Sequence, residues 1–200
     1  MFPISLNLSG KLVVVVGGGS VGRRKLNAVV GSGAAVRLVD PRPQPGLPSE
    51  VTHVTEAYRA EHLEGASLAF ACATPEVNAR VVADCRACGV WVNAATSPDD
   101  GDFALPAVVR RGDFTLAVGT GGASPALARR VREKLEAEFD VAFAEWVRVL
   151  AEVRRDVLAT VPDESRRALL DSFAEWHWLG RIRAEGAGAV LEAMRALLPG

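Results

Sequence analysis

The stretch LVVVVGGGSVGRRK, residues 12–25, decides the fold class of this chain. It opens with Leu12–Val16, a continuous apolar run of mostly β-branched side chains, the pattern of a parallel strand buried on both faces. Gly17, Gly19 and Gly22 follow with the spacing G-x-G-x-x-G, and a helical period begins there. In such a unit the first glycine permits the tight turn, the second lets the backbone approach a pyrophosphate, and the third brings helix against sheet. The stretch therefore predicts the first unit of a Rossmann-type domain that binds a dinucleotide.

A second expected strand, residues 35–40, ends in the carboxylate of Asp40, 18 residues after Gly22. An acidic side chain at this place accepts hydrogen bonds from ribose hydroxyls, while the helix N-terminus attracts the phosphates. The carboxylate also repels a 2′-phosphate and so favours NAD over NADP, a preference that Arg42 weakens. The alternative is a Rossmann-like domain that binds no dinucleotide and uses the loop only as a turn. We expect NAD as the cofactor, bound by Gly17, Gly19, Ser20, Val21, Gly22, Asp40, Pro41 and Thr74.

Strands and helices continue to alternate after this unit. We expect strands near Val51–Val54, at 68–73 and at 90–93, with a helix over 76–88. This order predicts the α/β class, with a doubly wound parallel sheet. The alternation of apolar and polar residues over 2–8 predicts an additional edge strand.

The character of the sequence changes after Gly112. We expect a strand at Phe114–Val118, a glycine-rich loop, and a helix from Ser124-Pro125 to about Phe139, because serine at the N-cap and proline at the first position start helices. The rest is rich in Ala, Leu, Arg and Glu and predicts three or four helices. The expected domains are a Rossmann domain over 1–112, a small α+β segment over 113–142 and a helical domain over 143–200.

Composition argues against several classes of partner. Net charge is −1, with 23 basic and 24 acidic residues, so no global field favours nucleic acid or a membrane surface. Leu12–Val16 is too short to span a bilayer, and the N-terminus lacks the features of a secretory signal. Three cysteines argue against a disulfide framework, which makes the cytoplasm the expected location. We expect Cys85 and Cys88 to be packing residues.

The histidines and tryptophans point to no further site. His53, His62 and His177 lack metal-ligand spacing, so we expect no metal site. Trp176 and Trp178 are expected in the core of the helical domain, although they would also suit the wall of a ligand cleft.

A second glycine-rich loop, residues 119–123, also stands before a helix. It carries hydroxyls at Thr120 and Ser124, and Arg129, Arg130, Arg132 and Lys134 follow on the helix. A ligand with several carboxylates would suit this stretch. The alternative is a capped surface helix with solvated arginines.

At this point the sequence resembles the precorrin-2 dehydrogenase family, the N-terminal region of siroheme synthase. The resemblance runs from Phe2 to about Glu138 and more loosely through the helical tail. Its carriers are Phe2-Pro3, Leu6, Leu8, Gly10-Lys11, Val16 to Lys25, Ala73-Thr74, Asn78, Val92-Asn93, Asp102-Phe103, Pro106-Ala107, Arg111-Gly112, Gly121 to Pro125, Leu127 to Arg129 and Arg132 to Lys134.

The resemblance implies a homodimer in which 113–142 is the dimerisation segment. It implies oxidation of precorrin-2 to sirohydrochlorin with NAD⁺, and in some members insertion of ferrous iron as well. The substrate-binding residues that it implies are Asn93, Thr96, Thr120, Gly121, Gly122 and Ser124.

One position departs from the family. Thr96 stands where the family has an aspartate, its favoured general base, and threonine is no base near neutral pH. Asp99, Asp100 and Asp102 are nearby substitutes in the sequence. We therefore keep a second hypothesis, a tetrapyrrole- or NAD-binding protein without catalysis. A third, an NAD-sensing regulatory domain, leaves the second glycine-rich motif unexplained.

Overall fold

The computed structural model describes residues 2–199, apart from the side chain of Pro98. The chain divides into two compact units, Met1–Leu105 and Pro106–Gly200. Each unit has its own hydrophobic core.

The first unit is a parallel sheet of five strands in the order β3-β2-β1-β4-β5, which confirms the predicted fold class. Strands β2 and β3 lie on one side of β1 in the sheet, and β4 and β5 lie on the other. The direction in which successive strands are added to the sheet therefore reverses at β1. Ligands of such sheets bind outside the carboxyl ends of the strands at this switch point. The elements are β1 (Leu12–Val16), α1 (Ser20–Val29), β2 (Ala35–Val39), β3 (Val51–Val54), β4 (Ala66–Ala71), α2 (Pro75–Cys88), β5 (Trp91–Ala94) and the short 3₁₀ turns Ala60–Leu63 and Pro98–Asp100.

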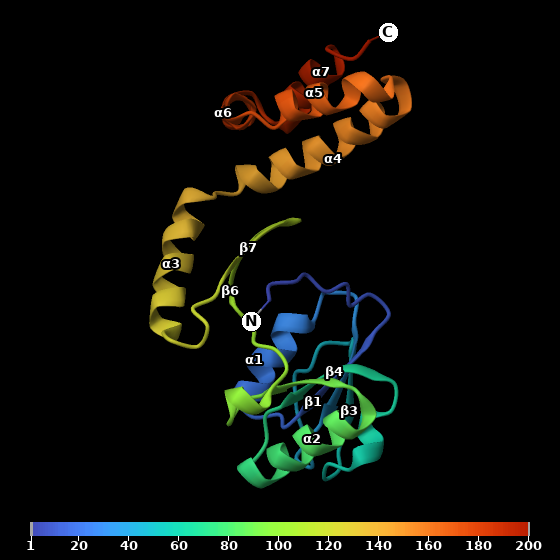
Figure 1. The fold of residues 1–200 in the computed structure, drawn as a ribbon, viewed down its shortest axis with the longest axis vertical. Coiled ribbons are helices and arrows are strands. Elements are labelled where there is room, and N and C mark those ends of the chain that lie inside the picture. Colours follow the sequence, from blue (N-terminus) through green and yellow to red (C-terminus); the bar gives the residue numbers. More distant parts are fainter. Residues whose placement is uncertain (1, 200) are drawn as a thin grey trace. The chain divides into compact units, whose positions relative to one another are not determined.

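Helices α1 and α2 cover opposite faces of this sheet (Figure 1). Side chains alternate along a strand, so Val13 and Val15 pack on the side of α1, and Val14 and Val16 on the side of α2. All four valines are at most 2% exposed. The unbroken apolar run of β1 follows from this burial on both faces.

The expected edge strand at 2–8 is wrong. The segment has no regular secondary structure, and among the described residues no strand pairs with it. Phe2, Ile4 and Leu6 are exposed, and Leu8 packs beside the α1 face of the sheet. Alternation of apolar and polar residues is not enough to form a strand, because a strand also needs a neighbouring strand to pair with.

The second unit begins earlier than expected. Strand β6 (Ala107–Arg111), which the sequence did not predict, pairs antiparallel with β7 (Phe114–Val118) through the turn at Gly112. Since β6 pairs with β7 and not with the five-stranded sheet, the boundary falls between Leu105 and Pro106 and not after Gly112. Helix α3 (Pro125–Glu138) follows.

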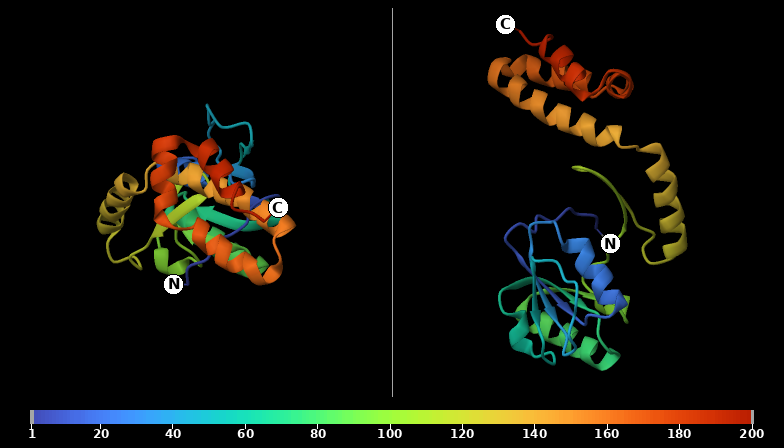
Figure 2. Two further views of the ribbon diagram at one scale, coloured as in Figure 1. Left: turned by 90° about the horizontal axis from the view of Figure 1, so that it is seen from above. Right: turned by 180° about the vertical axis from the view of Figure 1, so that it is seen from behind.

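Four further helices follow α3 in the described part of the second unit, where the sequence predicted three or four. Figure 2 shows them from two further sides. Along α4, Val149, Val153 and Val157 are fully buried at helical spacing. Trp178 lies in this core, as expected. Trp176 is 67% exposed, and its ring centroid lies 5.8 Å from that of Phe143 and 5.9 Å from that of Trp146. These helices are α4 (Ala142–Thr160), α5 (Asp163–Phe173), α6 (Trp176–Glu185) and α7 (Ala187–Arg195).

Among the described residues, none of the helices combines the length and the apolar character that a membrane span requires.

Candidate functional site

The glycine loop between β1 and α1 is packed too tightly for side chains at two positions. Gly17 has φ +100°, and a Cβ there would lie 2.5 Å from the carbonyl oxygen of Cys72 at the end of β4. A Cβ on Gly22 would lie 1.8 Å from the carbonyl oxygen of Gly17. The structure thus gives the first and third glycines the geometry that their spacing predicts, a tight turn and a close approach of helix to sheet.

The N-terminus of α1 is free to receive an anion. Its N-cap is Gly19, and in the described part of the chain no side chain caps the helix and no acidic residue lies in its first turn. A Cβ on Gly19 would meet nothing within 4 Å, so the backbone is open on this side. The N–H groups of Ser20, Val21 and Gly22 and the helix dipole therefore suit a pyrophosphate. The residues present fit the dinucleotide that the sequence predicts.

Asp40 lies beside this loop, but its carboxylate faces the protein. It is 3% exposed; Oδ2 accepts from the Gly18 N–H at 2.6 Å, and Oδ1 accepts from the Arg42 N–H at 2.8 Å. Burial alone would raise the pKa of the Asp40 carboxyl, but these hydrogen bonds and the Arg42 guanidinium lower it below its ordinary value. The carboxylate holds the glycine loop in place, and its expected contact with ribose stays a prediction.

Two residues that the sequence analysis did not assign to the cofactor, Gln44 and Arg23, also lie at the loop. The Gln44 side chain covers Gly18, where an added Cβ would lie 2.4 Å from its Cδ. Arg23 of α1 donates to Gln44 Oε1 from Nε at 3.2 Å and from Nη2 at 2.9 Å. The signal available in the sequence is the proline-rich segment 41–48, which starts at the predicted cofactor residue Pro41.

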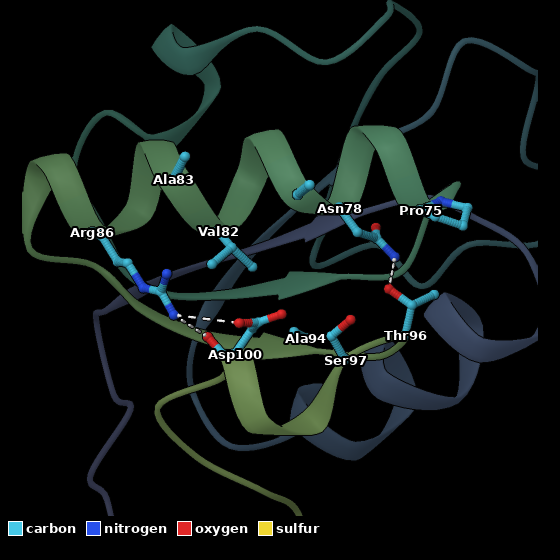
Figure 3. A pocket seen from close by; sticks show the side chains of 10 residues that line it. Pro75, Asn78, Val82, Ala83, Arg86, Ala94, Thr96, Ser97 and Asp100 are labelled. Atoms are coloured by element: carbon cyan, nitrogen blue, oxygen red, sulfur yellow. Dashed lines mark hydrogen bonds and ion pairs between the residues drawn. The ribbon is translucent and has the colours of Figure 1, made fainter.

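The carboxyl ends of β4 and β5 are joined by Asn78 of α2. Its Oδ1 accepts from the Ala73 N–H at 2.8 Å, and its Nδ2 donates to the Thr96 hydroxyl at 3.2 Å. Thr74, a predicted cofactor residue, is the N-cap of α2. A cavity of about 390 Å³ lies between α2 and the loop after β5, with Asn78 and Thr96 among its lining residues (Figure 3).

One of the aspartates near Thr96 in the sequence, Asp100, lines the same cavity as Thr96. Arg86 donates to the Asp100 carbonyl at 3.0 Å, at the far end of α2 (Figure 3). Asn78 and Arg86 are eight residues apart, which is roughly 12 Å of helix. Asp102 Oδ2 accepts from the Val92 N–H at 2.8 Å, inside β5. The Asp102 carboxylate is thus bound to the backbone of β5, Asp100 Oδ1 lies 3.9 Å from Arg86 Nη2, and Asp99 is exposed on the turn before them. A role of any of the three as the general base stays a prediction.

Asn93 is buried at the end of β5. It is 8% exposed, and its Nδ2 donates to the Phe103 carbonyl at 2.7 Å. Its Oδ1 is buried without a hydrogen-bond partner among the described residues. The Asn93 side chain thus binds the loop after β5 through Nδ2, and its Oδ1 can still accept a hydrogen bond.

In the second unit the Ser124 hydroxyl caps α3, and the Thr120 hydroxyl binds the loop before it. Thr120 Oγ1 accepts from the Ser124 N–H at 3.1 Å, and Ser124 Oγ accepts from the Leu127 N–H at 3.2 Å at the start of α3. Gly121 and Gly122 both have positive φ, +61° and +89°. In these two hydrogen bonds the hydroxyl oxygens of Thr120 and Ser124 are acceptors, so both O–H groups can still donate. The local structure is therefore compatible with both interpretations of this loop.

The sheet order, the glycine loop and the free helix N-terminus define a Rossmann-type dinucleotide-binding protein. The family described as "Putative NAD(P)-binding" matches residues 4–107, and "Sirohaem biosynthesis protein central" matches residues 111–138. The chain belongs to this NAD(P)-binding family, and the resemblance drawn from its motifs is confirmed.

Similar proteins include several named "Siroheme synthase". That of Gluconacetobacter diazotrophicus is 34% identical over 83% of this chain and 37% of its own length. That of Nitrosomonas europaea is 33% identical over 91% of this chain and 41% of its own length. That of Pseudomonas putida is 34% identical over 98% of this chain and 43% of its own length. The chain thus spans about two fifths of the length of these curated relatives. A solved structure, "SirC, precorrin-2 dehydrogenase", shares the fold, with a TM-score of 0.77 and 23% identity over 98% of this chain and 100% of that one.

Proposed function

We propose that this chain binds NAD at the N-terminus of α1 and oxidises precorrin-2 to sirohydrochlorin. The observation that carries the proposal is the open, uncapped glycine loop at the switch point of the sheet, in a chain whose relatives are siroheme synthases. The solved structure with the same fold is titled a precorrin-2 dehydrogenase, which agrees with this reaction.

Each part of the loop has a role in holding the cofactor. The backbone of Gly17, Gly19 and the first turn of α1 would bind the pyrophosphate. Asp40 holds Gly18 through a hydrogen bond to its N–H. Pro41 would contact the adenosine end of the cofactor, and Thr74, the N-cap of α2, would contact it beyond the end of β4. When bound, NAD⁺ accepts a hydride from the reduced macrocycle, and the protein chiefly supplies proximity.

A proton must also leave the substrate. The Thr96 hydroxyl is no base near neutral pH. Because Asn78 Nδ2 donates to the Thr96 oxygen, the Thr96 O–H can donate to a group other than Asn78. We assign to Thr96 the positioning of a water molecule that takes the proton. Without a carboxylate at this position, we expect little insertion of ferrous iron.

The carboxylate arms of the substrate would bind the second glycine-rich loop. Thr120 and Ser124 offer O–H donors, and Gly121 and Gly122 offer backbone N–H donors on an open turn. Such donors suit several anionic groups on one flexible ligand.

We also propose a homodimer formed through β6, β7 and α3. A two-stranded sheet is marginal by itself in water. Along α3, Leu127 is 53% and Val131 37% exposed, at the spacing of one helix face. A second copy of the chain would cover this face. We further place the protein in the cytoplasm, in line with its three free thiols.

Anaerobic turnover of precorrin-2 with NAD⁺ tests the function in wild type and in Thr96→Asp, by NADH formation and the sirohydrochlorin spectrum. We expect wild type to turn over, and Thr96→Asp to raise the rate by about 100-fold, the low end of general-base catalysis. Turnover by Thr96→Asp alone would identify a binding protein without catalysis. If NAD binds and neither protein turns over, the tetrapyrrole assignment is wrong.

A further inference from the structure

The side-chain amide of Asn78 is fixed in one orientation. Asn78 is 2% exposed, and its Oδ1 accepts from the Ala73 N–H at 2.8 Å. Nδ2 donates to the Ala73 carbonyl at 3.3 Å and to the Thr96 hydroxyl oxygen at 3.2 Å. Because only an acceptor can meet the Ala73 N–H, a reversed amide would place two donors against each other. These three hydrogen bonds therefore determine that Thr96 contacts the nitrogen end of the amide.

This orientation decides what the Thr96 hydroxyl can do (Figure 3). A hydroxyl has one proton and two lone pairs. Since Nδ2 of Asn78 is a donor, Thr96 Oγ1 is the acceptor in their hydrogen bond, and the Thr96 proton points to a different group. Thr96 also lines the cavity between α2 and the loop after β5. The Thr96 hydroxyl can therefore donate to a water or a ligand in this cavity.

The charged groups that line the cavity contact each other. Among the described lining residues these are Arg86 and Asp100, and Arg86 Nη2 donates to the Asp100 carbonyl and lies 3.9 Å from its Oδ1. Beside Asn78, hydrogen bonds from its own N–H and from Thr74 lower the pKa of Glu76, and burial raises the pKa of the Cys72 thiol to about 11. Neither Glu76 nor Cys72 therefore titrates between about pH 6 and 9.

We propose that Asn78 is a positioning residue of the proton step, which holds the Thr96 hydroxyl as a donor to the water that takes the proton. The inference rests on the proposed function, because it names the group that orients Thr96 in that reaction. The hydride of the substrate goes to NAD⁺, and the proton goes to this water. A water that accepts from Thr96 passes the proton only to solvent, so the site acts as a weak base.

A carboxylate in place of the amide would reverse the polarity of this contact. One oxygen would still accept from the Ala73 N–H, and the other, at the place of Nδ2, would accept from the Thr96 O–H. The Thr96 oxygen would then accept from the water. As the water takes the proton of the substrate, it would give one of its own to Thr96, and Thr96 would give its proton to the carboxylate. Asn78→Asp thus supplies a base without a change at Thr96.

Steady-state kinetics of the full chain over about pH 6 to 9 test this inference, in the anaerobic assay of precorrin-2 with NAD⁺. Wild type is compared with Asn78→Asp, with Thr96→Val, which has a similar shape and no hydroxyl, and with the double variant. Asn27→Asp, at an exposed position of α1, is the control with the same change of charge. Thermal unfolding and calorimetric titration with NAD⁺ check that each variant is folded and binds the cofactor.

We expect Asn78→Asp to raise kcat by about tenfold or more, the effect of one hydrogen bond to a charged group, and to leave KM unchanged. Its kcat should gain an ionisation within this pH range, because burial raises the pKa of a carboxyl group. Wild type and Asn27→Asp should lack this ionisation. In the double variant the gain should be lost, and kcat should equal that of Thr96→Val.

Three results overturn the inference and leave the proposed function intact. They are a folded Asn78→Asp with the kcat of wild type, a gain of the same size in the Thr96→Val background, and a change in KM alone. If Asn78→Asp does not fold, Asn78→Ser replaces it in the same cycle: losses of kcat in Asn78→Ser and Thr96→Val that add overturn the inference, and losses that do not add support it.

Two further results bear on the proposed function as well. Turnover by Asn78→Asp alone supports the inference and identifies wild type as a protein that binds without catalysis. If NAD⁺ binds and neither wild type nor any variant turns over, the inference and the tetrapyrrole assignment are both wrong.

Discussion

The contact between Gly22 and Gly17 sets how α1 leaves the sheet. A Cβ on Gly22 would lie 1.8 Å from the Gly17 carbonyl oxygen, so Gly22→Ala forces the turn apart. We expect the free energy of unfolding to fall by about 1–3 kcal/mol, the usual cost of overpacking, and the affinity for NAD to fall with it. Thermal unfolding and calorimetric titration measure the two effects.

Gly19→Ala is the matched control for this substitution. A Cβ on Gly19 meets nothing within 4 Å, and its φ of −67° suits any residue. Stability should stay the same while the affinity for NAD falls, because the methyl group enters the space that the pyrophosphate approaches. Unchanged stability and affinity in Gly22→Ala would show that the close packing is not required.

Asp40 makes the stability of the first unit depend on pH. Its pKa is lowered in the folded state, so the carboxylate stabilises the fold above its ordinary pKa of 3.8, and this contribution is lost as the pH falls through the lower folded value. Urea unfolding of wild type and Asp40→Asn should therefore differ most at pH 5 to 7 and converge below about pH 4. Asp113→Asn, at an exposed turn, is the control and should show no such convergence. A difference that is constant down to pH 2 contradicts this role for Asp40.

Among the elements, those buried on both sides were predictable from the sequence. The unbroken run of valines in β1 predicted a central parallel strand, which is buried on both faces. The spacing of the glycines predicted the loop that follows this strand. Residues 2–8 and β6 show the opposite case, since a half-exposed strand exists only where another strand pairs with it. For the same reason the sequence missed the contact of Arg23 with Gln44, which depends on how the loop 41–48 folds back over Gly18.

Helix α3 is the element on which the proposed dimer can be tested. Leu127 and Val131 form its exposed apolar stripe, with the half-buried Leu135 one turn further on. Leu127→Glu with Val131→Glu should convert the dimer to a monomer in sedimentation velocity, because charges at the centre of an interface are costly to bury. Ala137→Glu places the same charge on another side of α3 and should leave the dimer intact. A double variant that sediments as wild type excludes this face as the interface.

At the scale of the whole molecule, the two units divide the proposed tasks between them. The clusters on both faces of the sheet draw only on the first unit, and the helical cluster draws only on the second. The glycine loop, Asp40 and the Asn78–Thr96 pair are in the first unit, whereas the Thr120–Ser124 loop is in the second. Cofactor binding should therefore be separable from turnover.

A fragment of residues 1–105 tests this separation. Because its cores are complete, we expect it to unfold cooperatively and to bind NAD⁺ with a Kd within about threefold of the full chain, a difference of less than 1 kcal/mol. It should not oxidise precorrin-2, since it lacks the loop to which we assign the substrate carboxylates. Calorimetry and the anaerobic assay measure the two properties, and residues 106–200 serve as the control that should bind no NAD⁺. Turnover by the fragment would remove the Thr120–Ser124 loop from the reaction, while a folded fragment that binds no NAD⁺ would show that the glycine loop needs the second unit to form its site.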